Sequence, residues 1–149
     1  MYSGILLPTD GSDESDIVLD HAIDLAKQYD ATLEGLFVND QRSYAGPGAD
    51  IGRERIEAAH ESAGERALDR VKSAAKEAKI DVSTTRTDGV PGQVILNAIE
   101  ENDPDLVVMG THGRTGIQRA LLGSVAENVI RRSSVPIHLV PVGGDEDSE

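Results

Sequence analysis

The chain has 149 residues, enough for one domain with a buried core, and no cysteine, which excludes disulfides, thiolate metal sites and cysteine nucleophiles. It carries 14 lysines and arginines against 27 aspartates and glutamates, and the net charge of −13 disfavours nonspecific binding to nucleic acids. Because no apolar stretch approaches the roughly 20 residues of a membrane-spanning helix, an integral membrane protein is excluded as well.

The kind of acidity adds an expectation about habitat and location. Only four of the 14 basic residues are lysines, aspartates outnumber glutamates, and the chain has one phenylalanine and no tryptophan. This pattern resembles proteins from a high-salt cytoplasm, with an ordinary acidic surface as the alternative, since net charge informs solubility rather than fold. The opening residues show neither the basic region nor the apolar segment of a secretion signal, so we expect a cytoplasmic protein.

Five strands and four helices are predicted in alternation. The strands are apolar runs rich in β-branched residues, at 5–7, 33–38, 82–86, 106–109 and 136–140. The helices are predicted by apolar residues at helical spacing: Val18, Ala22, Leu25 and Tyr29; then Ile56, Ala63, Ala67, Val71, Ala74 and Ala78; then Ile95, Ala98 and Ile99; and last Leu121, Leu122, Val125, Ala126 and Val129. Such alternation is typical of parallel βαβ units with right-handed crossovers. The predicted fold class is therefore α/β, a doubly wound sandwich.

Turn and cap residues mark the ends of several elements. Ser12 and Asp13 would cap the first helix. Pro91 suits the first turn of the third helix, and Asp103 with Pro104 would end that helix before the fourth strand.

Two segments carry no clear periodicity. The segment 39–52 contains a Gly-Pro-Gly run and is predicted to be a loop, either a lid or a simple solvent loop. The tail has no apolar residue to pack, so we expect one domain over 1–142 and a disordered acidic tail over 143–149.

A glycine-rich segment follows the fourth predicted strand. It runs from Gly110 to Gly116 with a third glycine at Gly113, and Gly123 with Ser124 opens the last apolar stretch. Glycines let backbone amides approach an anion closely, and the free amides at a helix start add donors and partial positive charge. The segment has neither the lysine of GxxxxGK[ST] nor the spacing of GxGxxG, so it matches neither the P-loop nor the dinucleotide motif. Its composition predicts a phosphate-binding loop.

The order of the strands gives a second reason to expect a ligand here. In open α/β sheets, ligands bind beyond the carboxyl ends of the strands where the winding reverses, which in the order 3-2-1-4-5 is between strands one and four. Strand one ends at Pro8, Thr9 and Asp10, and strand four ends at Gly110. Asp10 would then accept hydrogen bonds from ribose hydroxyls, with a simple turn as the structural alternative.

These residues resemble the nucleotide signature of the universal stress proteins. Two residues separate Gly110 from Gly113, nine separate Gly113 from Gly123, and Ser124 follows directly. The resemblance covers nearly the whole chain, including 5–12, 89–96 and 105–124. It implies the ATP-binding, UspA-like type and a flavodoxin-like or Rossmann-like three-layer sandwich, with a five-stranded parallel sheet in the order 3-2-1-4-5. Together with the composition, it favours a halophilic archaeal source.

The resemblance also implies which residues form the nucleotide site. Three of them would hold the adenosine end: Asp10 at the ribose or adenosine, the backbone of Val38 at the adenine edge, and Gly110 against the ribose. The others would offer the phosphates amides, a hydroxyl or flanking side chains, and they are Gly113, Gly123, Ser124, Val125, His112 and Arg114. The neighbouring Pro8, Thr9 and Met109 complete the set.

The resemblance further implies ATP or AMP as the ligand, Mg²⁺ or Mn²⁺ bound with it, and a homodimer paired through the last strand, 135–142. A divalent ion also answers a physical need, because ATP carries about four negative charges and an exposed helix N-terminus contributes only about 0.3–1 kcal/mol per charge. Arg114 or Arg119 and high salt would offset the remaining repulsion. No metal ligand is expected from the protein itself.

The four histidines show no metal motif. None has HExxH spacing, so a zinc enzyme is not expected. His21 is predicted to be a satisfied or partly exposed packing residue of the first helix, and His60 to lie on a solvated face. His138 lies in the last predicted strand and would approach its symmetry mate in a dimer paired through that strand.

Three functions follow from these observations. The leading one is an adenine-nucleotide-binding stress-response regulator, whose dimer or surface depends on the nucleotide. A slow ATP hydrolase is the enzymatic alternative, with His112 and Arg114 as the suggestive residues, and it is not favoured. An interaction module that does not use the pocket is the other alternative. No catalytic residue is assigned, and a flavin is not expected because the aromatic residues are few.

Overall fold

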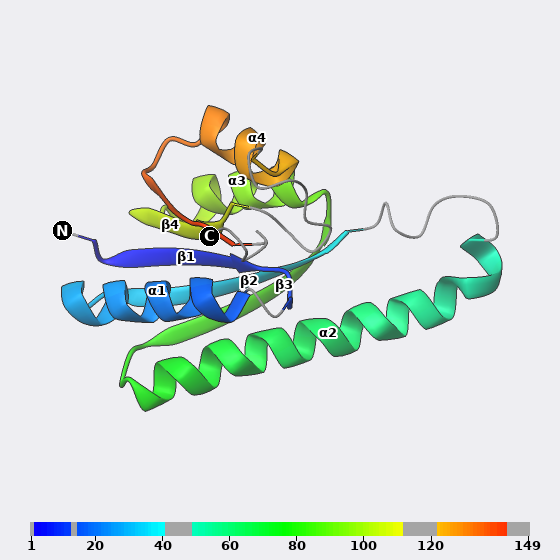
Figure 1. Ribbon diagram of the computed structural model, residues 1–149, viewed down its shortest axis with the longest axis horizontal. Helices are drawn as coiled ribbons and strands as arrows, with labels where there is room; N and C mark the ends of the chain where they lie inside the picture. The colour runs from blue at the N-terminus through cyan, green and yellow to red at the C-terminus, as the bar shows by residue number, and fades with distance from the viewer. Residues whose placement is uncertain (1, 13–14, 41–48, 112–121, 143–149) are drawn as a thin grey trace, which may run out of the picture.

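The computed structural model describes residues 2–12, 15–40, 49–111 and 122–142, in which strands and helices alternate as the sequence predicts (Figure 1). The elements are β1 (Gly4–Thr9), α1 (Ser15–Tyr29), β2 (Thr32–Asp40), α2 (Ala49–Glu77), β3 (Val82–Gly89), α3 (Pro91–Asn102), β4 (Leu106–Gly110), α4 (Ser124–Arg132) and β5 (Ile137–Val140). The strands pair in parallel in the order β3-β2-β1-β4-β5. The predicted fold class and strand order are confirmed.

Two layers of helices cover the sheet, α1 and α2 on one face and α3 and α4 on the other (Figure 1). Alternate side chains of β1 serve the two faces: Ile5 and Leu7 pack with α1, and Leu6 packs with α3 and α4. Each is at most 1% exposed. Burying such a side chain contributes about 1.5–3 kcal/mol, which explains why the central strands are apolar at consecutive positions.

The predicted loop over 39–52 was wrong at both ends. β2 continues to Asp40, opposite Gly89 of β3, and the Asn39 side-chain Nδ2 donates to the Asp88 Oδ1 at 2.8 Å. α2 begins at Ala49, and its first turns extend past the ends of the strands (Figure 1). A helix that overhangs the sheet needs no apolar face, so its start carries no periodic signal. The middle of the predicted loop, 41–48, lies outside the described residues.

The predicted helix ends are confirmed in α3 and need adjustment in α4. Pro91 lies in the first turn of α3, and Asp103 ends the helix in a left-handed conformation with φ 53°, its amide donating to the Ile99 carbonyl. α4 begins at Ser124, so Leu122 precedes the helix instead of forming part of it.

Two further expectations concern a membrane-spanning helix and residues that lie outside the described ranges. Among the described residues, no helix combines the length and the apolar character needed to cross a membrane. The tail 143–149 and the helix-cap residue Asp13 lie outside the described residues, so their predictions stand as predictions.

Asp105 ties the amino end of β1 to the loop before β4. Its Oδ2 accepts hydrogen bonds from the Ser3 hydroxyl at 2.7 Å, the Ser3 amide at 2.8 Å and the Gly4 amide at 3.0 Å. These bonds, led by the one from the Ser3 hydroxyl, lower the pKa of Asp105. The ionised carboxylate therefore favours the folded chain.

This contact predicts a specific pH dependence of stability. A lowered pKa stabilises the fold above the ordinary value of about 3.9, and the stabilisation is lost as the pH falls through the lowered pKa. Asp105→Asn is expected to melt at a lower temperature than the wild type near neutral pH, with the two melting temperatures converging as the pH falls through the lowered pKa of Asp105. Thermal melts across that range test this, with Asp24→Asn on exposed α1 as the charge control. Parallel curves for the wild type and Asp105→Asn would contradict it.

Candidate functional site

The carboxyl ends of β1 and β4 are neighbours at the point where the winding of the sheet reverses. Their pairing ends at Leu6 and Val107, although β1 continues to Thr9 and β4 to Gly110. On its other side, β1 stays paired with β2 as far as Thr9 opposite Phe37. The last residues of β1 and β4 are therefore not paired with each other, which leaves backbone at this edge open to a ligand.

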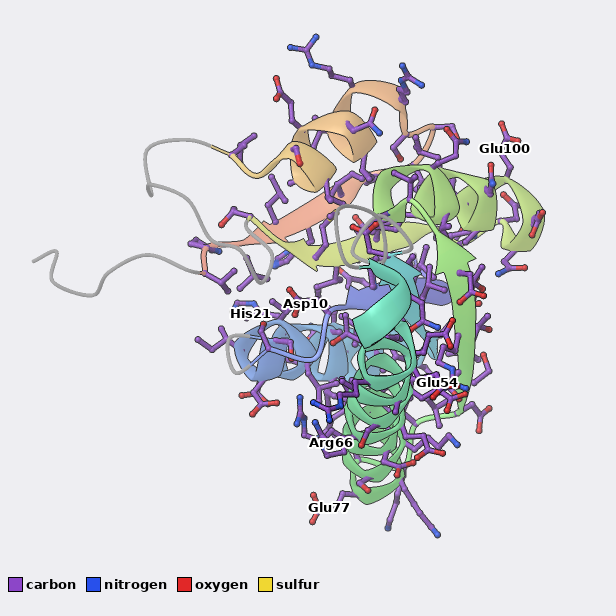
Figure 2. The ribbon with its side chains drawn as sticks, turned by 90° about the vertical axis from the view of Figure 1, so that its right-hand side faces the viewer. Asp10, His21, Glu54, Arg66, Glu77 and Glu100 are labelled. Carbon is purple, nitrogen blue, oxygen red and sulfur yellow. The ribbon has the colours of Figure 1, made fainter. Side chains whose placement is uncertain are left out.

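Asp10 directly follows β1 and is half-buried at this edge; Figure 2 looks onto it from the side of the strand ends. Its Oδ1 accepts a hydrogen bond from the Ser12 amide at 2.9 Å, and the Thr9 hydroxyl accepts one from the Gly11 amide at 3.3 Å. Gly11 has φ 78°, the left-handed region that favours glycine. The turn expected as the structural alternative is thus present. It occupies one carboxylate oxygen, and Oδ2 has no hydrogen-bond or ion-pair partner among the described residues.

The start of α4 supplies free backbone donors. Gly123 is the N-cap residue, and no side chain caps the helix. The first hydrogen bond of the helix runs from the Glu127 amide to the Gly123 carbonyl. The amides of Ser124, Val125 and Ala126 precede that bond and donate to no other described residue. With the partial positive charge of a helix start, these amides form a suitable anion site.

A small hydrogen-bond network holds this helix start at the end of β4. The Gly123 amide donates to the Thr111 carbonyl at 2.9 Å, and the Thr111 amide donates to the Val140 carbonyl at 3.1 Å. The Val142 amide donates to the Thr111 hydroxyl at 3.2 Å. Thr111 therefore links β4, α4 and the end of β5. Thr111 and Gly123, which border the segment 112–121, are held beside the strand ends as a result.

The remaining predicted site residues that the structure describes differ in their burial and in the face that they occupy. Val38 is half-buried and lies one residue beyond the last pairing of β2 with β1, while β3 still pairs on its other side. Pro8 and Gly110 are half-buried at the edge. Met109 is 5% exposed and packs in the core beneath α3 and α4, so its side chain does not face the edge. The predicted residues His112, Gly113 and Arg114 lie outside the described residues, as does Arg119.

Two cavities between described helices lie away from this edge. One, of about 620 Å³, lies between α1 and α2 and is lined by Leu19, Asp69, Arg70, Ser73, Ala74, Lys76 and Glu77. The other, of about 230 Å³, lies between α3 and the end of α4. Neither cavity is lined by a predicted site residue.

The sequence analysis missed the residues that support the Asp10 turn. A Cβ on Gly11 would lie 3.6 Å from the Ala63 carbonyl oxygen and the Ala67 Cβ, both on α2, and 3.7 Å from the Phe37 ring. α2 and Phe37 therefore form the floor under the turn. An isolated glycine inside a helix, Gly64, was the available signal, because such a glycine often marks a close packing contact.

A second missed group is a pair of histidines. His21 of α1 is exposed, although a satisfied or partly exposed packing residue was predicted, and its ring centre lies 5.5 Å from that of His138 on β5. No sequence spacing indicates this pair, because the contact exists only through the packing of α1 on the sheet.

Comparisons with known proteins agree with this architecture. Residues 1–141 match the model of the universal stress protein family. Universal stress protein MJ0531 of Methanocaldococcus jannaschii is 40% identical over 140 residues, which cover 94% of this chain and 82% of that protein.

Solved structures agree as well. Universal stress protein UspA from Lactobacillus plantarum superimposes with a TM-score of 0.79 at 26% identity, covering 93% of this chain and 97% of that one. A universal stress protein solved in complex with cAMP superimposes with a TM-score of 0.71 at 29% identity, with the same coverage of 93% and 97%. The family match spans nearly the whole chain, and its predicted fold is the fold found; the chain belongs to the universal stress protein family.

Proposed function

We propose that this protein binds an adenine nucleotide, ATP or AMP, at the carboxyl ends of β1 and β4. The observation that carries the proposal is the pairing of opposite chemistries at one edge: the uncapped amides of α4 beside β4, and the Asp10 carboxylate at the end of β1. A nucleotide needs both, because its phosphates require donors and its ribose hydroxyls require an acceptor. The cAMP complex of the relative supports an adenine nucleotide as the class of ligand.

Each end of the ligand has its own set of residues in this proposal. The Asp10 Oδ2 accepts hydrogen bonds from the ribose, and the backbone of Val38 meets the adenine edge. The amides of Ser124 and Val125, with the Ser124 hydroxyl, hold the phosphates together with the glycine-rich segment 110–123. Mg²⁺ or Mn²⁺ enters with the nucleotide through its phosphate oxygens, since such hard cations prefer oxygen ligands, and it offsets repulsion from the net charge of −13.

The regulatory part of the proposal concerns the edge strand. β5 is at the end of the sheet, and a second copy pairing through 135–142 would extend the sheet across a dimer. Thr111 connects the nucleotide edge to this strand through its bonds to Val140 and Val142. Nucleotide binding would thus reach the dimer contact through one residue. We expect this regulator in the cytoplasm of a halophilic archaeon, and without catalytic turnover.

Calorimetry with ATP and AMP, with and without Mg²⁺ in high-potassium buffer, tests the site. Gly113→Val should lower affinity at least about tenfold, because a side chain there would displace a phosphate and each lost charge-assisted hydrogen bond costs about 1.5–3 kcal/mol. The matched control is Gly52→Val, since a Cβ on Gly52 meets no atom within 4 Å.

The outcomes separate the alternatives. Wild-type binding that Gly113→Val loses and Gly52→Val keeps supports the site. No binding to correctly folded wild type would contradict the proposal and leave the interaction module as the better explanation. Phosphate release above the buffer rate, abolished in His112→Ala, would instead favour the slow hydrolase.

A further inference from the structure

His21 and His138 bring two imidazoles together on the face of the sheet covered by α1. The register of β4 and β5 shows which way the His138 side chain points. His138 lies opposite Val108, which packs in the core on the α1 face. The His138 side chain therefore points toward α1, where His21 lies with its ring centre 5.5 Å away and the ring planes tilted by 42°.

The nitrogens of this pair are available for a ligand. Among the described residues, neither imidazole makes a hydrogen bond or an ion pair. His21 is exposed and His138 is half-buried, so water reaches the pair. This pair leaves its nitrogens to solvent or to a ligand.

The spacing of the rings matches shared coordination of one metal ion. A zinc–nitrogen bond of about 2.0–2.1 Å places the metal roughly 3.2 Å from the centre of the ring, so two imidazoles at a tetrahedral angle have centres about 5.2 Å apart. The observed 5.5 Å is close to this, and the tilted planes allow one nitrogen of each ring to face a common point. Small changes in the exposed His21 rotamer would close the difference.

The surroundings favour a cation. Asp20 and Asp24 flank His21 on α1 and are exposed, and the chain carries a net charge of −13. In the described part of the chain, no group of three or more His, Asp or Glu side chains is arranged to hold a metal, so water would complete the coordination.

We propose that His21 and His138 form a two-histidine site for a borderline divalent cation such as Zn²⁺, Ni²⁺ or Cu²⁺. Nitrogen ligands select these ions over Mg²⁺ and Mn²⁺, so the site is distinct in chemistry from the one proposed for the nucleotide. A bound ion links the edge strand β5 to α1. Because the His138 side chain points out of the sheet plane, strand pairing at the β5 edge leaves it accessible.

Zn²⁺ alone is the probe, titrated by calorimetry into the nucleotide-free chain of 149 residues at about pH 7.5. Excess Mg²⁺ in the buffer occupies carboxylates that bind hard cations. The histidines of the chain supply the variants: His21→Gln and His138→Gln remove the pair, and His60→Gln is the matched control. Circular dichroism confirms the fold of each variant.

We expect one Zn²⁺ per chain, an affinity at least about tenfold lower in His21→Gln and His138→Gln, and no change in His60→Gln. Zn²⁺ should also raise the melting temperature of the wild type and not of His21→Gln, because it binds only the folded pair. Equal affinity in His21→Gln, equal losses in a control, or no saturable binding would each overturn the proposal. If His138→Gln fails to fold, the exposed His21→Gln decides alone.

Discussion

Asp10→Ala is expected to lower the affinity for ATP and AMP by about 10–100-fold. A hydrogen bond to a charged acceptor contributes about 1.5–3 kcal/mol, and each 1.4 kcal/mol is a factor of ten in affinity. The lost carboxylate would also reduce repulsion toward the phosphates, so the net loss measures how strongly the ribose contact outweighs that repulsion. Calorimetry with the wild type and the variant gives the difference directly.

Two controls separate the ribose contact from a disturbed loop. Asp10→Asn keeps an oxygen that can accept from the Ser12 amide, so it preserves the turn while removing the charge. A 2′,3′-dideoxy nucleotide removes the hydroxyls, so if the carboxylate and the hydroxyls interact, Asp10→Asn should lose no affinity for it, and the reduced repulsion should if anything raise that affinity. An equal loss of affinity for the hydroxylated and dideoxy ligands in both variants would contradict a ribose contact. Asp24→Ala, on exposed α1, controls for net charge.

The sheet could be predicted because a strand that is buried on both faces has apolar residues at consecutive positions. β1 and β4 are apolar at consecutive positions, as strands covered on both faces must be, and the helical spacing between strands requires parallel pairing. The same reasoning placed Asp10 and Gly110 at one edge. Because β1 and β4 are adjacent in the sheet, the residues after β1 and the glycine-rich segment after β4 are neighbours in space although they are far apart in the sequence.

The start of α2 could not be predicted in this way. Ala49 and the turns after it overhang the sheet, and Glu54 and Arg55 are exposed, so no apolar period marks the helix. Helix periodicity reports the face that packs, not the helix itself.

Contacts between side chains from distant elements also escaped the sequence. His21 and His138 meet only because α1 packs beside β5, and nothing in the residues around either one indicates the other. Gly64 alone indicates a close contact, since glycine inside a helix is unfavourable by about 1 kcal/mol and usually has a packing reason. The identity of the partner, Phe37, required the structure.

Phe37→Ala is expected to destabilise the fold by about 3–5 kcal/mol, the usual cost of removing a buried phenylalanine ring. Phe37 is 3% exposed and packs with Ala67 and Leu68 of α2. Because domains of this kind have only about 5–15 kcal/mol of stability, the variant should still fold but unfold at a clearly lower urea concentration. Urea unfolding of the wild type, Phe37→Ala and the milder Phe37→Leu measures the difference.

A pair of glycine substitutions tests the same contact from the opposite side. A Cβ on Gly64 would lie 2.8 Å from the buried Phe37 ring, whereas one on Gly92 would meet only the end of the Asn128 side chain, which can rotate away. Overpacking costs about 1–3 kcal/mol, and alanine regains about 1 kcal/mol of helix propensity. Gly64→Ala should therefore be neutral to destabilising, and Gly92→Ala neutral to stabilising. The reverse order would contradict the packing.

The Phe37 variants also decide what holds the nucleotide edge in place. The Phe37 ring lies under Gly11, so its loss should loosen the turn that carries Asp10 and weaken nucleotide binding beyond the loss of global stability. Calorimetry well below the melting temperature separates the two effects. If Phe37→Ala is destabilised yet binds ATP as the wild type does, the hydrogen bonds of the turn are sufficient to hold Asp10. If Phe37→Leu restores both stability and affinity, packing from α2 determines the geometry of the site.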